Sequence, residues 1–170
     1  MTDPKWLAHA RTLAGTRETP GAANNIRIMG WAVRARAWLG AAYVGDAVPW
    51  CGLFVAEVMQ AAGFRPPRGF VGLRAKQWAS WGTAVSTVAT RPPLGAIAVF
   101  GRDGGGHVGF VTGVHRDGRL RILGGNQGDA VNERTFPRSR LIAFRWPAGV
   151  ALADAAPWVD GAGVATSGEE

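Results

Sequence analysis

Cysteine is almost absent from this sequence, because Cys51 is the single cysteine among 170 residues. The folded chain therefore holds no internal disulfide, and its folding does not require an oxidising compartment. Long hydrophobic runs are also missing, since no stretch reaches the ~20 apolar residues of a membrane-spanning helix. The first residues, Met-Thr-Asp-Pro-Lys-Trp, lack the basic start and apolar core of a signal peptide. We expect a product made in the cytoplasm without stable membrane insertion.

Acidic residues are scarce as well, with 12 Asp and Glu against 19 Lys and Arg. All 19 basic residues lie at or before Arg145 and four acidic residues follow it, so residues 1–146 carry a formal charge of +11. A surface this basic favours an anionic partner, such as nucleic acid, an anionic membrane or a bacterial cell wall, without choosing among them. The hydrophobic content of 47% indicates a globular protein with one sizeable core.

The only cysteine lies at the opening of a predicted helix over roughly 49–62. Pro49 suits the first helical position and Gly63 suits the left-handed residue after the last turn. Cys51 lies one turn before Val55, on an apolar stripe with Phe54, Val58, Met59 and Ala62. The N-terminus of a helix favours a thiolate, which is the nucleophilic form of cysteine. The alternative is that Cys51 is a small buried hydrophobic residue.

Three further helices are predicted in the first half of the chain. Asp3-Pro4 begins a short helix that ends at Gly15, and residues 15–25 form an ordered loop. Asn24 or Asn25 caps a helix to about Leu39, and a fourth helix covers Val71 to Trp81. In the second helix we expect one set of side chains to point inward: Ile26, Met29 and Val33. We expect the other set to be solvated: Arg27, Arg34 and Arg36.

After residue 93 the pattern changes to that of strands. The predicted strands are Gly95–Gly101, His107–His115, Arg119–Asn126, Asp129–Phe136 and Leu141–Trp146, with a flexible loop over 101–106 and a two-residue turn at Asp117-Gly118. Helices first and an antiparallel meander second predict an α+β fold, with the helices on one side of the sheet. We expect residues 1–147 to form one catalytic domain and residues 148–170 a flexible tail, which Trp158 could dock.

The hairpin offers a geometric test for a base beside Cys51. With Asp117-Gly118 as the turn, Asn126 faces Gly109, and His107 lies diagonally from Asn126 on the same face. The other face of the second strand carries Arg119 and Arg121, so we expect the helices to pack on the His107 face. The three side chains would then be arranged as nucleophile, base and orienting amide. Individually, His107 could be a structural histidine and Asn126 a turn residue.

Four motifs in this order resemble the CHAP and NlpC-type cysteine amidohydrolases, and more narrowly the small peptidoglycan-cleaving enzymes of phages. They are Val-Pro-Trp-Cys-Gly-Leu-Phe-Val (48–55), Gly-His-Val-Gly-Phe-Val-Thr-Gly (106–113), Leu-Gly-Gly-Asn-Gln-Gly-Asp-Ala-Val (123–131) and Pro-Arg-Ser-Arg-Leu-Ile-Ala-Phe-Arg-Trp-Pro (137–147). Gly15-Thr-Arg-Glu18 and Asn24-Asn25 fit too, so the resemblance spans about residues 5–147. Gly52 and Ile26 depart from the residues common at those positions, which affects subsite shape and not the chemistry.

The resemblance implies a papain-like fold and hydrolysis of an amide bond in the wall peptide, or of the bond between muramic acid and L-alanine. It implies that Cys51 is the nucleophile, His107 the base and Asn126 the third polar residue, with no metal or other cofactor. We add the N–H of Cys51 as an oxyanion donor, and Glu18, Trp50 and Gln127 as substrate-binding candidates.

The implied partner is bacterial peptidoglycan, with no nucleic acid, and the chain is expected to be a monomer. It would be made in a bacterial host and act on the wall through a membrane pore, from a virion or after injection.

The main alternative is a basic module that binds nucleic acid or cell wall and in which Cys51 is inert. Eight tryptophans and the positive charge are compatible with stacking and phosphate contacts, although no nucleic-acid motif is present. A zinc site is disfavoured, because His9, His107, His115 and Cys51 lack close ligand spacing.

Overall fold

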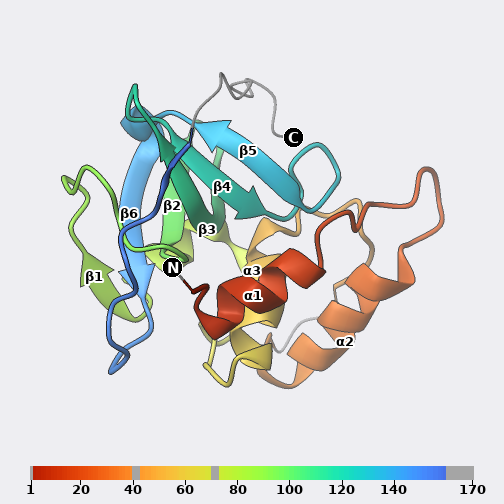
Figure 1. The fold of residues 1–170 in the computed structure, drawn as a ribbon. Helices are drawn as coiled ribbons and strands as arrows, with labels where there is room; N and C mark the ends of the chain where they lie inside the picture. The colour runs from red at the N-terminus through yellow and green to blue at the C-terminus, as the bar shows by residue number, and fades with distance from the viewer. Residues whose placement is uncertain (1, 40–42, 70–72, 160–170) are drawn as a thin grey trace.

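The computed structural model describes residues 2–39, 43–69 and 73–159. Three α-helices come first, followed by a short 3₁₀ helix and then the strands, which confirms the predicted α+β fold (Figure 1). The helical elements are α1 (Lys5–Thr12), α2 (Ile26–Leu39), α3 (Cys51–Ala61), η2 (Ala75–Ser80) and η3 (Arg138–Arg140). The strands are β1 (Thr83–Val85), β2 (Ile97–Arg102), β3 (Gly105–His115), β4 (Leu120–Gly124), β5 (Asn132–Phe136), β6 (Leu141–Trp146) and β7 (Trp158–Val159). No helix within these ranges is both long and apolar enough to cross a membrane.

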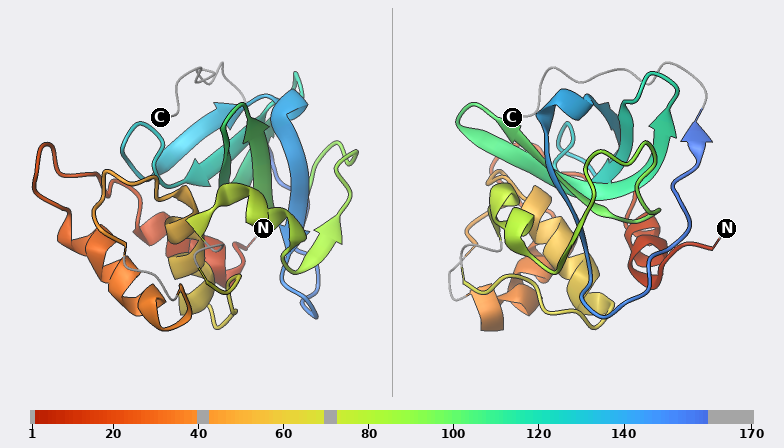
Figure 2. Two further views of the ribbon diagram at one scale, coloured as in Figure 1. Left: turned by 180° about the vertical axis from the view of Figure 1, so that it is seen from behind. Right: turned by 90° about the vertical axis from the view of Figure 1, so that its left-hand side faces the viewer.

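The sheet is not the simple meander that the sequence predicted. Its strand order is β1-β6-β2-β3-β4-β5, so β6 pairs with β2 instead of β5, and β7 pairs in parallel with β3. The sheet also curls strongly, because Phe100 of β2 and Phe136 of β5 stack with ring centroids 4.9 Å apart although two strands separate them. In a flat sheet that separation would be about 14 Å. The helices lie beneath this curled sheet (Figure 2, right).

The β3–β4 hairpin differs from its predicted register twice, and the two differences add. His115 pairs with Arg119 around a three-residue turn in which Gly118 has φ +89°, where a two-residue turn was predicted. A bulge between Val111 and Gly113 then shifts the register again. Before the bulge the total shift is two residues, so the β3 residues up to Val111 keep their predicted face, whereas Gly113 and Val114 beyond it are shifted by one residue and change faces relative to β4. His107 therefore shares a face with Gly124, as the alternation predicted.

The helices pack on the face opposite to the one predicted. Phe110 of β3 contacts Phe54 of α3 edge-on, with ring centroids 6.0 Å apart, and Phe110 alternates with His107 along the strand. His107 instead points to the concave face, where its ring stacks on Phe136 at 4.9 Å and 5°. The prediction was wrong because the curl lets the sheet fill its own concave face with Phe100 and Phe136.

Helix α2 begins where the sequence predicted, but it turns a different stripe inward. The Asn25 Oδ1 caps it by accepting the N–H groups of the second and third helical residues. Ile26 and Val33, which we expected inside, are 89% and 69% exposed, whereas the buried stripe consists of Ile28, Trp31, Ala32 and Ala35. Trp31 decides the orientation, because its large ring packs against Trp50 and Phe54 at the start of α3.

Helix α3 forms the centre of the helical layer. It begins at Cys51 after a Trp50 cap, two residues later than predicted, and Gly63 follows it with the expected positive φ of 84°. Its residues from Cys51 to Met59 are all buried, Glu57 included, and that carboxylate accepts hydrogen bonds from Arg34 of α2. The predicted fourth helix is reduced to η2, and the first residues of its range lie outside the described residues.

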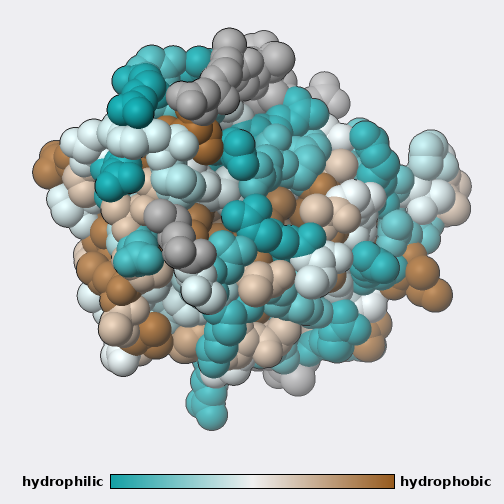
Figure 3. Space-filling model, viewed as in Figure 1, coloured by the Kyte–Doolittle hydropathy of each residue, from teal (hydrophilic) through white to brown (hydrophobic). Residues whose placement is uncertain are grey.

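The chain after residue 147 is not a free tail, at least as far as Val159. Ala156 is buried and its N–H donates a hydrogen bond to the Pro92 carbonyl, and β7 pairs with the end of β3. Trp158 docks this segment as anticipated, with the Arg116 guanidinium 4.7 Å from its ring centroid. Residues 160–170 lie outside the described residues. On the face seen in Figure 3, hydrophilic side chains are spread widely, with smaller hydrophobic patches between them.

Candidate active site

The loop before α3 is fixed by hydrogen bonds to the loop after α1. The buried carboxylate of Asp46 accepts the N–H groups of Thr19 and Asn25 at 3.0 and 2.7 Å. The Tyr43 hydroxyl donates to the Val48 carbonyl at 2.6 Å, which closes the turn that leads to Cys51. The position of the thiol at the start of α3 is therefore set from both sides, by the helix and by this loop.

Trp50 and Glu18 form a pair immediately beside Cys51. The Trp50 ring is fully buried and its Nε1–H donates to the Glu18 carboxylate at 2.6 Å. Burial raises the pKa of Glu18 above its ordinary value, the Trp50 hydrogen bond opposes this, and the carboxylates of Asp129 and Asp46 add to the rise. Trp50 thus supports the Cys51 backbone. It was predicted to contact substrate, but its ring is buried and presents no surface to a substrate.

The His107 ring has a defined partner on one nitrogen. Its Nε2 lies 2.9 Å from Gln127 Oε1, and both side chains are buried. The orientation of the Gln127 amide is fixed at its other end, because its Nε2 donates to the Asn132 carbonyl at 2.6 Å and to the Asn132 Oδ1 at 3.0 Å. The oxygen must therefore face His107, so in the neutral ring the proton is on Nε2 and Nδ1 is the unprotonated nitrogen.

The third polar residue was predicted as Asn126, which stays a prediction, and the structure shows a hydrogen bond between His107 and the next residue, Gln127. Strand β4 ends at Gly124, and Asn126 has a left-handed backbone with φ 56°. The prediction extended the alternation of the strand through Asn126, where the chain is already in a turn. The run Gly-Gly-Asn-Gln-Gly was the signal for this turn, because it is rich in residues that tolerate a positive φ. Gln127 is fully buried, so it is not a substrate contact either.

Two glycines separate His107 from the start of α3. A Cβ placed on Gly124 would lie 2.9 Å from His107 Nε2, and one on Gly125 would lie 2.7 Å from the Trp50 ring. Adjacent residues of an extended chain point to opposite faces, so the Gly124–Gly125 backbone lies between the imidazole and the residue before Cys51. No larger residue fits at either position without moving one of these groups.

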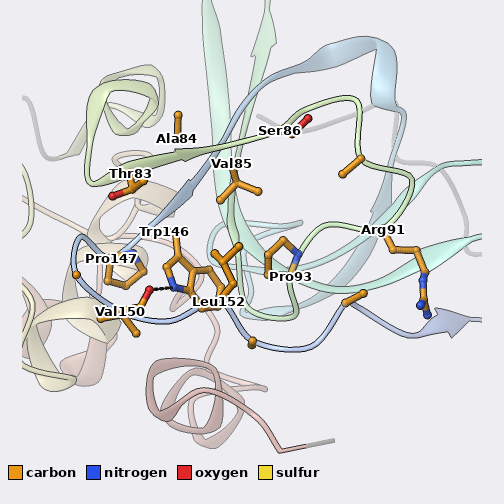
Figure 4. Close-up of a pocket in the computed structure, with 14 residues that line it drawn as sticks. Thr83, Ala84, Val85, Ser86, Arg91, Pro93, Trp146, Pro147, Val150 and Leu152 are labelled. Atoms are coloured by element: carbon orange, nitrogen blue, oxygen red, sulfur yellow. Dashed lines mark hydrogen bonds between the residues drawn. The ribbon is translucent and has the colours of Figure 1, made fainter.

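A cleft of about 540 Å³ opens at Cys51. Its lining combines Cys51 and Pro49 from the start of α3 with residues 104–106 from the beginning of β3, and Gly106 directly precedes His107. The structure thus brings the first residue of α3 and the first residues of β3 to one solvent-accessible cleft. A second hollow of about 560 Å³, between β1 and the segment after β6, contains none of the predicted site residues (Figure 4).

Comparison with known families agrees with this arrangement. Residues 43–126 match the family model described as the CHAP domain. This segment of the chain is similar to the CHAP domain. The match begins at Tyr43, just before the Cys51 helix, and ends at Asn126, so it contains Cys51 and His107. A search of the curated proteins finds no match to this chain.

CHAP domains are typically cysteine- and histidine-dependent amidohydrolases, and the family indicates peptidoglycan hydrolase activity. Among the described residues, no group of three or more His, Cys, Asp or Glu side chains is placed to hold a metal ion. Of the three substrate-binding candidates, Glu18 is the one with an exposed part, and its carboxylate also holds Trp50.

Proposed function

We propose that this CHAP-like domain hydrolyses an amide bond of the bacterial wall peptide, either within the stem or between muramic acid and L-alanine, through a Cys51 thioester. The observation that carries the proposal is the hydrogen-bonded state of His107, whose Nε2 is held by Gln127. This arrangement leaves Nδ1 as the basic atom, which is the requirement for a histidine that takes a proton from a thiol.

Gln127 takes the orienting role in this proposal, in place of Asn126. The Gln127 amide is fixed by Asn132 at one end and presents only an acceptor to His107 at the other. It therefore selects one tautomer and one ring orientation, which a residue in the third position of a catalytic triad must do. The stacked Phe136 ring holds the imidazole plane from one side.

The reaction proceeds in two steps. Cys51 loses its proton to His107 Nδ1, and the thiolate attacks the carbonyl carbon to form a C–S bond. As the C–N bond breaks, the imidazolium gives the same proton to the departing amine, leaving a thioester. Water then loses a proton to His107, attacks the thioester carbon and releases the carboxylic acid and the Cys51 thiol. The N–H of Cys51, at the start of α3, supplies one hydrogen bond to the oxyanion.

Purified wall sacculi test the proposal directly. Wild-type protein is expected to clear the suspension and release soluble muropeptides, whose masses identify the bond that is cut. Cys51→Ala and His107→Ala should release none above background while keeping the fold, as judged by circular dichroism. Cys51→Ala protein that clears the wall at the wild-type rate would exclude the mechanism and favour the alternative of an inert wall-binding module.

We also propose that the enzyme belongs to a phage or phage-like lysis system and is made in the host cytoplasm. Support comes from the resemblance of its motifs to the small phage enzymes. Expression inside bacteria should then leave the cells intact until a pore-forming protein is co-expressed, after which the culture should lyse. Lysis without the pore would contradict cytoplasmic retention.

A further inference from the structure

The cleft at Cys51 has a one-sided charge. Three of its lining residues are cationic: Arg74 and Lys76 at η2, and Arg102 at the end of β2. The remaining lining residues are apolar, glycine, one glutamine and Cys51, so no carboxylate of the described residues lines this cleft. Helix η2 and the β2–β3 hairpin, which carry these cations, lie side by side (Figure 2).

Lys76 and Arg102 are held near each other without a counterion. The Lys76 Nζ donates to the backbone carbonyl of Arg102 at 3.4 Å, and the Lys76 stem lies against Gly106, where a Cβ would be 3.0 Å from Lys76 Cγ. None of the ion pairs in the described part of the chain includes Lys76 or Arg102. Two exposed like charges that converge on one space repel each other, and a bound anion relieves that repulsion.

The acidic groups near Cys51 lie outside the cationic cleft. Burial raises the pKa of Tyr43, and electrostatic interactions with Glu18, Asp46 and Cys51 add to this rise, so these groups lie close together. None of the three other residues lines the cationic cleft. Cys51 therefore lies between an acidic and a basic region, and a substrate that carries a carboxylate is directed toward the basic one.

We propose that Lys76 and Arg102, with Arg74 beside them, form a carboxylate subsite that selects wall peptides with a free carboxylate next to the scissile amide. The inference rests on the proposed function, since it assigns a subsite to the same cleft. Two carboxylates of a wall peptide share this chemistry: the side carboxylate of a γ-linked glutamate, and the carboxylate at the end of the stem. Amidation removes the charge of either one and changes its shape little.

One preparation of sacculi, freed of phosphate polymers and split in half, provides the test. In one half, the free carboxylates are converted to carboxamides with a carbodiimide and ammonium ions. We expect wild-type protein to cleave the untreated half about two- to fivefold faster, which is the size of effect that an exposed ion pair produces. The preference should shrink in 0.5 M salt, because exposed charges are screened. Soluble stem peptides amidated at one carboxylate each then distinguish the two sources.

Variants assign the preference to the subsite. The double variant Lys76→Gln/Arg102→Gln should cleave both halves at similar rates, and Lys76→Arg should retain the preference. The matched control is Lys5→Gln/Arg36→Gln, which removes the same charge from exposed residues of α1 and α2 and should behave like the wild type.

Equal wild-type rates on the two halves would overturn the subsite while leaving the proposed function intact, and this comparison needs no variant to fold. A preference that survives in the Lys76→Gln/Arg102→Gln protein would also overturn it. Wild-type protein no more active than Cys51→Ala on either half would overturn the proposed function and the subsite together.

Discussion

Replacing Gln127 with glutamate tests the tautomer argument most sharply, because the two side chains have the same shape. Gln127 offers an acceptor to His107 and a donor to Asn132, and both contacts are buried. The Gln127→Glu side chain reproduces this pattern only as a neutral acid, with its carbonyl oxygen toward His107 and its O–H toward the Asn132 carbonyl. Ionised, it would place a negative oxygen where the structure has 2.6 Å to a carbonyl oxygen.

The folded state therefore raises the pKa of the new carboxyl above its unfolded value of about 4.3. A raised pKa gives stability that is complete below the unfolded pKa and is lost as pH rises toward the folded pKa. Between those two values the variant should lose about 1.4 kcal/mol per pH unit relative to the wild type. From pH 5 to pH 7 the gap in melting temperature should then widen by roughly 5–11 °C for a chain of this length.

Thermal unfolding of both proteins, followed by circular dichroism at half-unit pH steps, measures this gap. Gln77→Glu is the matched control, because Gln77 is exposed and its substitution should leave the gap constant over the same range. Gln127→Glu should also retain wall-clearing activity at pH 5 and lose it toward pH 8. A gap that does not change with pH would refute the assigned hydrogen-bond directions and, with them, the basic Nδ1 of His107.

Four smaller predictions follow. Gly125→Ala should destabilise the fold by about 1–3 kcal/mol in denaturant titrations, because its Cβ would lie 2.7 Å from the Trp50 ring; an unchanged midpoint contradicts this packing. Glu18→Gln should become more stable relative to the wild type as pH rises from 4 to 7, because the raised pKa of Glu18 means that ionising this carboxyl destabilises the folded wild type. A melting temperature of Glu18→Gln that falls relative to the wild type over this pH range would contradict the prediction. Asp46→Ala should lower the unfolding free energy by about 2–4 kcal/mol, because two loop N–H groups lose their acceptor, and Asp46→Asn should recover part of the loss. Asn126→Gly should keep wall-clearing activity, because glycine adopts the positive φ of this position; an inactive, folded Asn126→Gly protein would return the orienting role to Asn126.

The elements could be predicted from the sequence wherever a local rule determined them. The Asn25 cap, the Gly63 terminus and the bounds of β6 follow from capping and from strand patterns within a few residues of chain. The faces of α2 and of the sheet could not be predicted, because they depend on where Trp31 finds partners and on how far the sheet curls. Both depend on contacts between segments that are far apart in the sequence, so no short stretch of the sequence determines them.

The candidate site shows the same division. Cys51 and His107 could be named as candidates from the sequence because each lies near the start of a regular element, where local patterns determine its position along the chain. The third residue lies after β4 has ended, so the two-residue period no longer applies to it. There the backbone of Asn126 is left-handed, and the amide of Gln127, fixed by Asn132, reaches the imidazole.

The buried position of Gln127 also explains why a neutral amide suits this site better than a carboxylate. His107 lies on the concave face among Phe136 and other apolar side chains, where an isolated negative charge is costly. An amide fixes the ring without adding charge, and its second hydrogen bond is satisfied by Asn132 within the same turn. In the proposed mechanism the amide does not favour the imidazolium as a carboxylate would, so the start of α3 is expected to favour the thiolate. The proposed mechanism thus divides the electrostatic work between two elements: the start of α3 stabilises the nucleophile, and the turn after β4 orients the base.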